Sequence, residues 1–279
     1  MQNKIILKKS WMKQLFLFSF LCLGMSFNTF ADFSIEGHYQ GKKIYVQSPP
    51  DEDGFGFCIN KVTVNGDIIP VDIYSSAFQI DLSEYNIEIG QEVIIVFEHD
   101  EGCKPKLLNP EALRPRSTFV LEEISCSTIG ELKWSTTGET GKLNFLIEQY
   151  KWNKWIVVGE VLGIGTGDLN TYTFNIHPHS GENTVRLAQI DNTSKKRVTQ
   201  SISFVSGVTK EPKLTISKSK KQIEFLVNGV PTKTKYEIYD AYGNIVKKGF
   251  NSKVSYTNLK IGVYYINYDN KNDRIVVKE

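Results

Sequence analysis

The strongest pattern along this chain is an alternation of apolar and polar residues that starts near residue 33. Apolar side chains occupy every second position of 78–82 and again of 93–97. A period of two places successive side chains on opposite faces of a strand. No window of eleven or more residues keeps a helical period through its glycines and β-branched residues. Asn65-Gly66 between two apolar runs predicts a hairpin. The sequence therefore predicts an all-β protein of antiparallel sandwiches.

Breaks in this pattern divide the chain into three predicted units, which span 32–116, 117–206 and 212–279. Prolines between 104 and 115 end the first unit, and they favour an extended connection over a sheet edge rather than a strand. The segment 206–212 reads as the linker before the third unit. We expect three tandem antiparallel β-sandwich domains.

The first thirty-one residues have the pattern of a secretory signal peptide. Four lysines precede the apolar run 15–27, and Thr29-Phe30-Ala31 offers small residues for cleavage. This run is too short to span a bilayer, which needs about twenty apolar residues. We therefore predict a leader at 1–31, passage through the periplasm, and a final location in the medium or on the outer cell surface.

Removing the leader changes the charge argument. The whole chain has a formal net charge of +2, but all four charged residues of the leader are lysines, so the remainder is slightly acidic. Acidic residues dominate 32–121, whereas 207–279 holds 14 basic and 7 acidic residues. Scattered lysines on exposed strand faces keep a sheet soluble and its edges unpaired. We therefore predict no nucleic-acid partner.

Three cysteines remain after the leader, and thiols outside the cytosol tend to pair. Cys58 and Cys103 both lie in the first unit beside glycine and turn residues, so we predict a disulfide between them. Cys126 lies in an apolar, alternating stretch and is predicted to be a small residue of the core.

Residues with catalytic or binding chemistry are sparse. His177 and His179 could form part of a metal site, but they lack a third ligand nearby, and a turn before the next strand explains them better. Trp152 and Trp155 could stack on a sugar, although a hairpin tip with one buried tryptophan is the favoured interpretation. We predict no catalytic residue, no metal site and no cofactor, and hence a non-enzymatic protein.

The middle unit resembles a fibronectin type III-like module. Trp134 follows Leu132 and Lys133 on an early strand, where that fold packs a tryptophan into its core. Further matching segments are 145–149, 159–161, 163–166, 172–174 and 181–191. A module of this kind often precedes the sorting domain in secreted Bacteroidota proteins. The resemblance implies spacing or binding rather than chemistry.

Two sequence blocks and a basic, apolar end mark the third unit. It contains a Tyr-Asp-x-x-Gly block, a Leu-x-x-Gly-x-Tyr block and the closing segment 274–278. The motif residues are Tyr239, Asp240, Gly243, Leu259, Gly262, Tyr264 and Lys278. Gly243 is expected to supply a hairpin turn, and Gly262 a tight entry to a strand. The unit resembles the type A C-terminal sorting domain of type IX secretion. The resemblance implies that 212–279 is recognised by that secretion machinery.

These observations together predict a secreted or cell-surface protein with a binding or structural role. The first unit is the best candidate for specific binding, with a surface glycan or a protein as the ligand, because the other two units have generic explanations. The alternatives are a carbohydrate- or protein-binding adhesin and, less favoured, a small secreted hydrolase.

Overall fold

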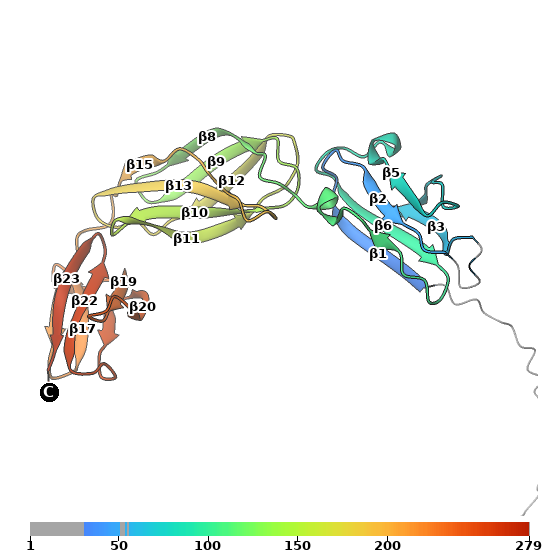
Figure 1. The fold of residues 1–279 in the computed structure, drawn as a ribbon. Coiled ribbons are helices and arrows are strands. Elements are labelled where there is room, and N and C mark those ends of the chain that lie inside the picture. Colours follow the sequence, from blue (N-terminus) through green and yellow to red (C-terminus); the bar gives the residue numbers. More distant parts are fainter. Residues whose placement is uncertain (1–30, 51–53, 55, 279) are drawn as a thin grey trace, which may run out of the picture.

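A computed structural model describes residues 31–50, 54 and 56–278. The predicted leader, apart from Ala31, therefore lies outside the described residues. Three β-units follow one another along a curved row (Figure 1). The described residues contain strands and two short 3-10 helices, and no helix among them is long and apolar enough to cross a membrane. The prediction of an all-β fold is confirmed.

The first unit packs a four-stranded sheet, β1-β6-β3-β4, against a three-stranded sheet, β5-β2-β7. All paired strands are antiparallel. The elements are β1 (Ala31–His38), β2 (Ile44–Gln47), β3 (Ile59–Val64), β4 (Asp67–Ile68), β5 (Ala77–Ile80), η1 (Leu82–Tyr85), β6 (Glu92–His99), β7 (Lys106–Leu107) and η2 (Pro110–Leu113).

The core of the first unit confirms the alternation seen in the sequence. Val93, Ile95 and Phe97 of β6 are fully buried, whereas the residues between them are at least partly exposed. The Asn-Gly hairpin is also present, because Asn65 and Gly66 both adopt positive φ between β3 and β4. Two successive positive φ values define the turn that matches strand twist, and glycine adopts them without steric cost.

The proline-containing segment differs in part from its prediction. Lys106 and Leu107 form a short strand, β7, that pairs with β2, so the prediction of no strand here was wrong. The pairing falls between Pro105 and Pro110, where each residue still has a backbone N–H to donate. Pro110 then begins η2, where a proline is tolerated because the first N–H groups of a helix have no partner within it.

The middle unit has the strand order of a fibronectin type III-like sandwich. Its strands are β8 (Val120–Cys126), β9 (Glu131–Thr137), β10 (Asn144–Lys151), β11 (Lys154–Leu162), β12 (Asn170–Asn175), β13 (Glu182–Ile190), β14 (Lys196–Val198) and β15 (Ile202–Val205). One sheet has the order β12-β9-β8 and the other β11-β10-β13-β14, with β15 also pairing with β13. The last strand position of the fold is thus shared by two short strands.

Trp134 lies at the centre of the middle unit's core, as the sequence predicts. Its side chain is 2% exposed, stacks on Tyr172 with ring centroids 5.1 Å apart, and meets the edge of Phe145. These three aromatic side chains come from both sheets, so they join the two layers.

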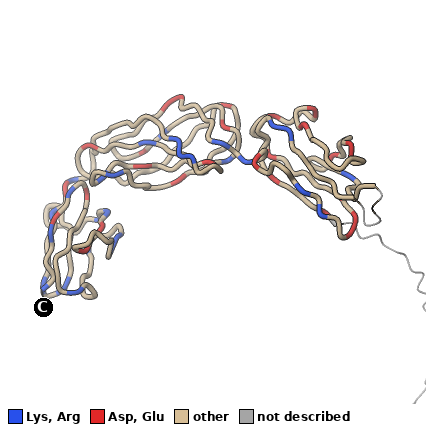
Figure 2. Tube along the Cα trace, viewed as in Figure 1, with Lys and Arg blue, Asp and Glu red and all other residues tan. Residues whose placement is uncertain are grey.

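The third unit is a separate sandwich with its own core. Its strands are β16 (Lys213–Ser217), β17 (Gln222–Val227), β18 (Val230–Pro231), β19 (Thr234–Tyr239), β20 (Ile245–Asn251), β21 (Lys253–Ser255), β22 (Gly262–Tyr268) and β23 (Lys271–Val277). One sheet contains β16, β17, β18 and β21, and the other has the order β20-β19-β22-β23. All buried members of its core cluster lie between Ile223 and Val277. Figure 2 shows lysine and arginine distributed over this unit.

Candidate functional sites

The predicted disulfide between Cys58 and Cys103 is confirmed, with Cα atoms 5.9 Å apart. Cys58 directly precedes β3 and Cys103 follows β6, and because these strands pair, the two loops meet at the same end of the sheet. The backbone N–H of Asp100 also donates to the carbonyl of Cys58, at 3.0 Å. The bridge therefore joins two loops at an end of the first unit where β3 and β6 are already paired.

Cys126 is the free cysteine of the described residues, and it is only half-buried. Its side chain packs against the core of the middle unit, so the predicted core position is correct in part. Burial raises the pKa of the Cys126 thiol to about 11. The thiol is therefore protonated at neutral pH, which lowers its reactivity.

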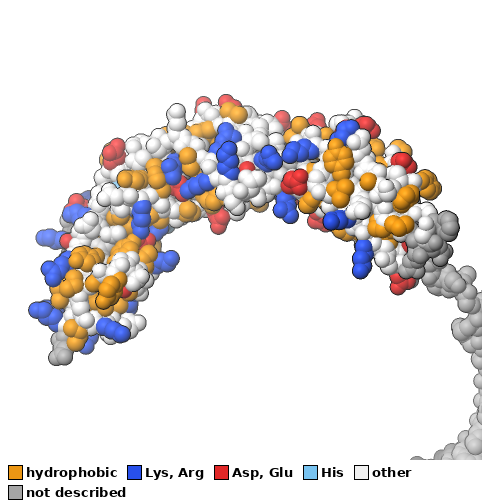
Figure 3. All heavy atoms as spheres, in the orientation of Figure 1, with side chains coloured by type: hydrophobic (Ala, Val, Ile, Leu, Met, Phe, Trp, Pro, Cys, Tyr) orange, Lys and Arg blue, Asp and Glu red, His pale blue; other side chains and the backbone are white. Residues whose placement is uncertain are grey.

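A shallow groove on the first unit has an aromatic wall and polar neighbours. Its volume is about 650 Å³, and it is lined by Tyr45, Asp72, Ser75, Ala77, Phe78, Gln79, Leu108 and Asn109. Tyr45 is 45% exposed and pairs across the sheet with Gln79. Figure 3 shows hydrophobic side chains gathered on the exposed face of this unit. An exposed aromatic ring beside amide and carboxylate groups can receive a sugar.

The two tryptophans of the β10–β11 hairpin do not form an open stacking platform. Trp152 and Asn153 form the tip with positive φ, and Trp152 and Trp155 are both half-buried, so the prediction of one buried tryptophan was wrong. The Arg186 guanidinium lies 3.9 Å from the centre of the Trp155 ring. Lys151 lies 5.3 Å from the Trp152 ring. Cations of the protein itself therefore engage these rings.

The same hairpin contacts the third unit. Lys154 Nζ lies 2.7 Å from Glu237 Oε2 and 2.7 Å from the hydroxyl of Tyr239. The Tyr239 hydroxyl in turn donates to Glu237. Burial acts to raise the pKa of Glu237, but its bonds to Lys154 and Tyr239 lower the pKa overall. Tyr239, one of the residues of the predicted sorting motif, therefore takes part in the junction with the middle unit.

A second polar contact joins the two units at Asp269, which is 1% exposed. Its carboxylate accepts hydrogen bonds from the Ser180 N–H at 3.0 Å and from the Ser180 hydroxyl at 2.5 Å. Asn270 donates from its side chain to the Ser180 carbonyl at 3.1 Å. The linker adds a bond from the Thr209 hydroxyl to the carbonyl of Pro178.

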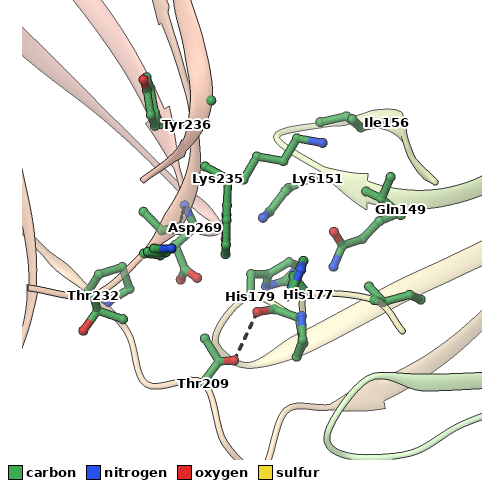
Figure 4. Close-up of a pocket in the computed structure, with 18 of the residues that line it drawn as sticks. Gln149, Lys151, Ile156, His177, His179, Thr209, Thr232, Lys235, Tyr236 and Asp269 are labelled. Atoms are coloured by element: carbon green, nitrogen blue, oxygen red, sulfur yellow. Dashed lines mark hydrogen bonds between the residues drawn. The ribbon is translucent and has the colours of Figure 1, made fainter. Parts of the chain in front are cut away.

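Between these two contacts lies a cavity of about 1110 Å³, lined by residues of both units (Figure 4). The middle unit contributes Gln149 and Lys151 from β10, and His177 and His179 from the loop after β12. Asn175 of β12 also lines it. The third unit and its linker contribute the remaining polar groups, which are Thr209, Lys210, Thr232, Lys233, Thr234, Lys235, Tyr236, Glu237, Lys248 and Asp269. The site is built from segments that lie far apart in the sequence, so no local sequence pattern predicts it.

The histidine pair lines this cavity, and each imidazole has another partner there. His177 is exposed and stacks on Phe250 of the third unit, with ring centroids 4.9 Å apart. His179 is buried, and its Nδ1 lies 2.7 Å from the Ser180 carbonyl. Within the described part of the chain, no group of three or more His, Cys, Asp or Glu side chains could hold a metal ion.

The motif residues of the third unit lie in different environments, which include a turn, the core and the exposed surface. Asp240 accepts hydrogen bonds from the N–H groups of Tyr242 and Asn244, and Gly243 has a φ of 87°, so these residues build the β19–β20 turn. The core of this unit receives Tyr264 and, in part, Leu259. Lys278 follows β23 and is exposed.

Gly262 begins β22 at a position where a side chain would also fit. A Cβ atom there would meet nothing nearer than the Tyr264 ring at 3.9 Å, which is an ordinary contact. The structure therefore gives no steric reason for glycine at this position.

Comparison with known proteins gives structural likeness only. No family model matches the chain, and no curated protein matches it. Among solved structures, the BSP domain of a biofilm-associated protein is 10% identical with a TM-score of 0.22; the alignment covers 90% of this chain and 63% of that one. The FN1–FN3 domains of chicken CNTN1 are 12% identical with a TM-score of 0.25, covering 88% of this chain and 97% of theirs. The central fibronectin-III array of RIM-binding protein is 13% identical with a TM-score of 0.17, covering 90% and 98%.

The architecture defines this chain as a tandem array of immunoglobulin- and fibronectin III-like β-sandwiches, one of which carries a disulfide.

Proposed function

We propose that this protein is exported and non-catalytic, and that its third unit directs type IX secretion. Its first two units bind a ligand or act as a structural spacer at the cell surface. The observation that carries this proposal is the independence of the third unit's core, whose buried members all come from that unit. A segment that is recognised as an address has to fold without help from its cargo. The disulfide in the first unit also fits an oxidising compartment outside the cytosol.

The linker supports the same proposal. Gly207, Val208, Lys210 and Glu211 are exposed, and Val208 has 61% of its surface accessible. The hydrogen bonds from Ser206 N–H to Gly181 and from Gly207 N–H to Thr128 lie on the middle unit's side of Val208. A chain cut after Val208 therefore keeps the backbone contacts that close the middle unit.

Export of a truncated chain tests the proposal. The full-length protein and a chain ending at Val208 are produced in a host with a type IX system, and both are followed in periplasm, surface and medium. We expect the truncated chain to fold, with its disulfide formed, but to remain in the periplasm, while the full-length protein leaves the cell. A periplasmic marker controls for leakage. Equal export of both chains would refute the sorting role.

The groove on the first unit favours a second candidate function, which is glycan binding by an adhesin. Tyr45 presents an exposed ring beside Asp72, Gln79 and Asn109. A glycan screen of the full-length protein should find a ligand whose binding Tyr45→Ala abolishes and Tyr242→Ala leaves intact. Tyr242 is the matched control because it is 90% exposed and lies in the third unit. Equal binding by both variants would exclude the groove.

A further inference from the structure

The cavity between the middle and third units has an excess of positive charge. Its lining includes five lysines and two carboxylates, a net charge of +3 with the histidines neutral. The lysines are Lys151, Lys210, Lys233, Lys235 and Lys248. Such an excess at one concave site attracts an anion.

The two carboxylates of the cavity already have other partners. Asp269 accepts two hydrogen bonds from Ser180, and Glu237 is bound by Lys154 and Tyr239. Among the residues that the structure describes, none of the five lining lysines takes part in an ion pair or a side-chain hydrogen bond. These lysines therefore have no direct ionic partner, and the contact of Lys151 at close range is with the Trp152 ring, 5.3 Å away.

Lys151 is the most unusual of these lysines, because it is only 5% exposed. Burial lowers the pKa of Lys151 to about 8, and the nearby charge of Lys235 acts in the same direction, while Asp269 and Glu237 oppose it. An ammonium group held away from water without an ionic partner is costly. An anion in the cavity would supply that partner and further favour the charged form of Lys151.

The rest of the lining suits a small molecule with an apolar face. Figure 4 shows Gln149, Lys151, His179 and Asp269 directed toward a common space. Ile156 and Val158 line the cavity from the middle unit, and Phe250 lines it from the third. A volume of about 1110 Å³ accommodates a sugar-sized ligand together with water.

We propose that this cavity binds a sugar-sized anion, whose carboxylate or phosphate group pairs with Lys151 and Lys235 while its body packs against Ile156, Val158 and Phe250. Because residues of both units line the site, the ligand joins the middle unit to the third. The site is separate from the sorting role proposed above, and it requires the full chain.

Calorimetric titration of the full-length protein tests this proposal with three probes: glucuronate, glucose 6-phosphate and glucose. We expect saturable binding of at least one of the two anions and none of the neutral sugar, and the anion that binds identifies the charged group. Lys151→Met keeps an unbranched side chain of nearly the same length without its charge, and it should weaken binding about ten- to a hundredfold. Lys220→Met is the matched control, because Lys220 is exposed in the turn after β16.

A second variant and an NMR titration test the proposal independently of whether Lys151→Met folds. If Lys151→Met does not fold, Lys235→Met removes the other proposed contact and should weaken binding in the same way. In the native protein, the pKa of Lys151, followed by NMR of its side-chain nitrogen, should rise above about 8 when the anion is added. Equal binding of glucose, absence of binding by both anions, or unchanged affinity in the folded variants would each overturn the proposal.

Discussion

At the scale of single residues, the middle unit contains a buried carboxylate whose cationic partner also covers an aromatic ring. Glu148 is 2% exposed, and its two carboxylate oxygens are taken by Arg186 at 2.8 Å and Lys196 at 2.5 Å. The same Arg186 lies over the Trp155 ring. One arginine thus satisfies a buried acid and covers an aromatic face, which a lysine could not do with the same geometry.

Replacing Trp134 tests the core of this unit. Trp134→Ala should reduce the free energy of unfolding of the middle unit by about 3–5 kcal/mol, since it leaves a large cavity between Tyr172 and Phe145. Trp134→Phe should cost less, because it keeps much of the packing and removes an indole N–H that is buried without a partner. Chemical denaturation measures both. A loss below about 0.5 kcal/mol for Trp134→Ala would contradict the register of β9.

The Glu148 site predicts a pH dependence. Burial acts to raise the pKa of Glu148, but the hydrogen bonds and charges of Lys196 and Arg186 lower it overall. A depressed pKa contributes stability above the unfolded value of about 4.3, and this contribution is lost as the pH falls through the folded value.

Glu148→Gln should therefore cost about 1–3 kcal/mol at pH 7 and less near pH 3, because pH 3 lies below the unfolded pKa and part of the contribution of the native carboxylate is lost there. Unfolding free energies of the native protein and the variant at both pH values measure this difference. An equal cost at both values would show that the ionised form of Glu148 contributes nothing.

At the scale of strands and loops, the sequence predicted those features that depend on residues close together in the chain. The Asn65-Gly66 turn and the alternation in β6 were both confirmed, since each depends on neighbours within a few residues. The short strand β7 was missed because it exists only through its pairing with β2, sixty residues earlier in the chain. Proline density alone could not reveal that partner.

The disulfide should stabilise the first unit alone. Cys58 and Cys103 are 45 residues apart, and closing a loop of that length contributes roughly 4 kcal/mol in the chain-entropy model. Calorimetry of Cys58→Ser/Cys103→Ser should show a lower melting temperature for one transition and unchanged values for the other two. The Cys126→Ser variant is the control. A shift shared by all three transitions would mean that the units do not unfold separately.

At the scale of the whole molecule, polar contacts join the units. Lys142 pairs with Glu92 at 3.1 Å between the first and middle units. Between the middle and third units, Lys154 pairs with Glu237, and Ser180 donates a hydrogen bond to Asp269. No local sequence pattern could predict these contacts or the lysine-rich cavity, because they depend on how complete sandwiches lie against each other. The predicted division into units, by contrast, rests on breaks between strand patterns, which are local features of the sequence.

The most direct test of the central claim is transplantation of the third unit. Residues 212–279 are fused to the C-terminus of an unrelated periplasmic protein with its own signal peptide, in a host with a type IX system. A fusion carrying 117–206 instead is the control, since it adds a sandwich of the same class without the motif residues. The account predicts that only the first fusion reaches the surface or medium. Retention of both fusions in the periplasm would contradict it.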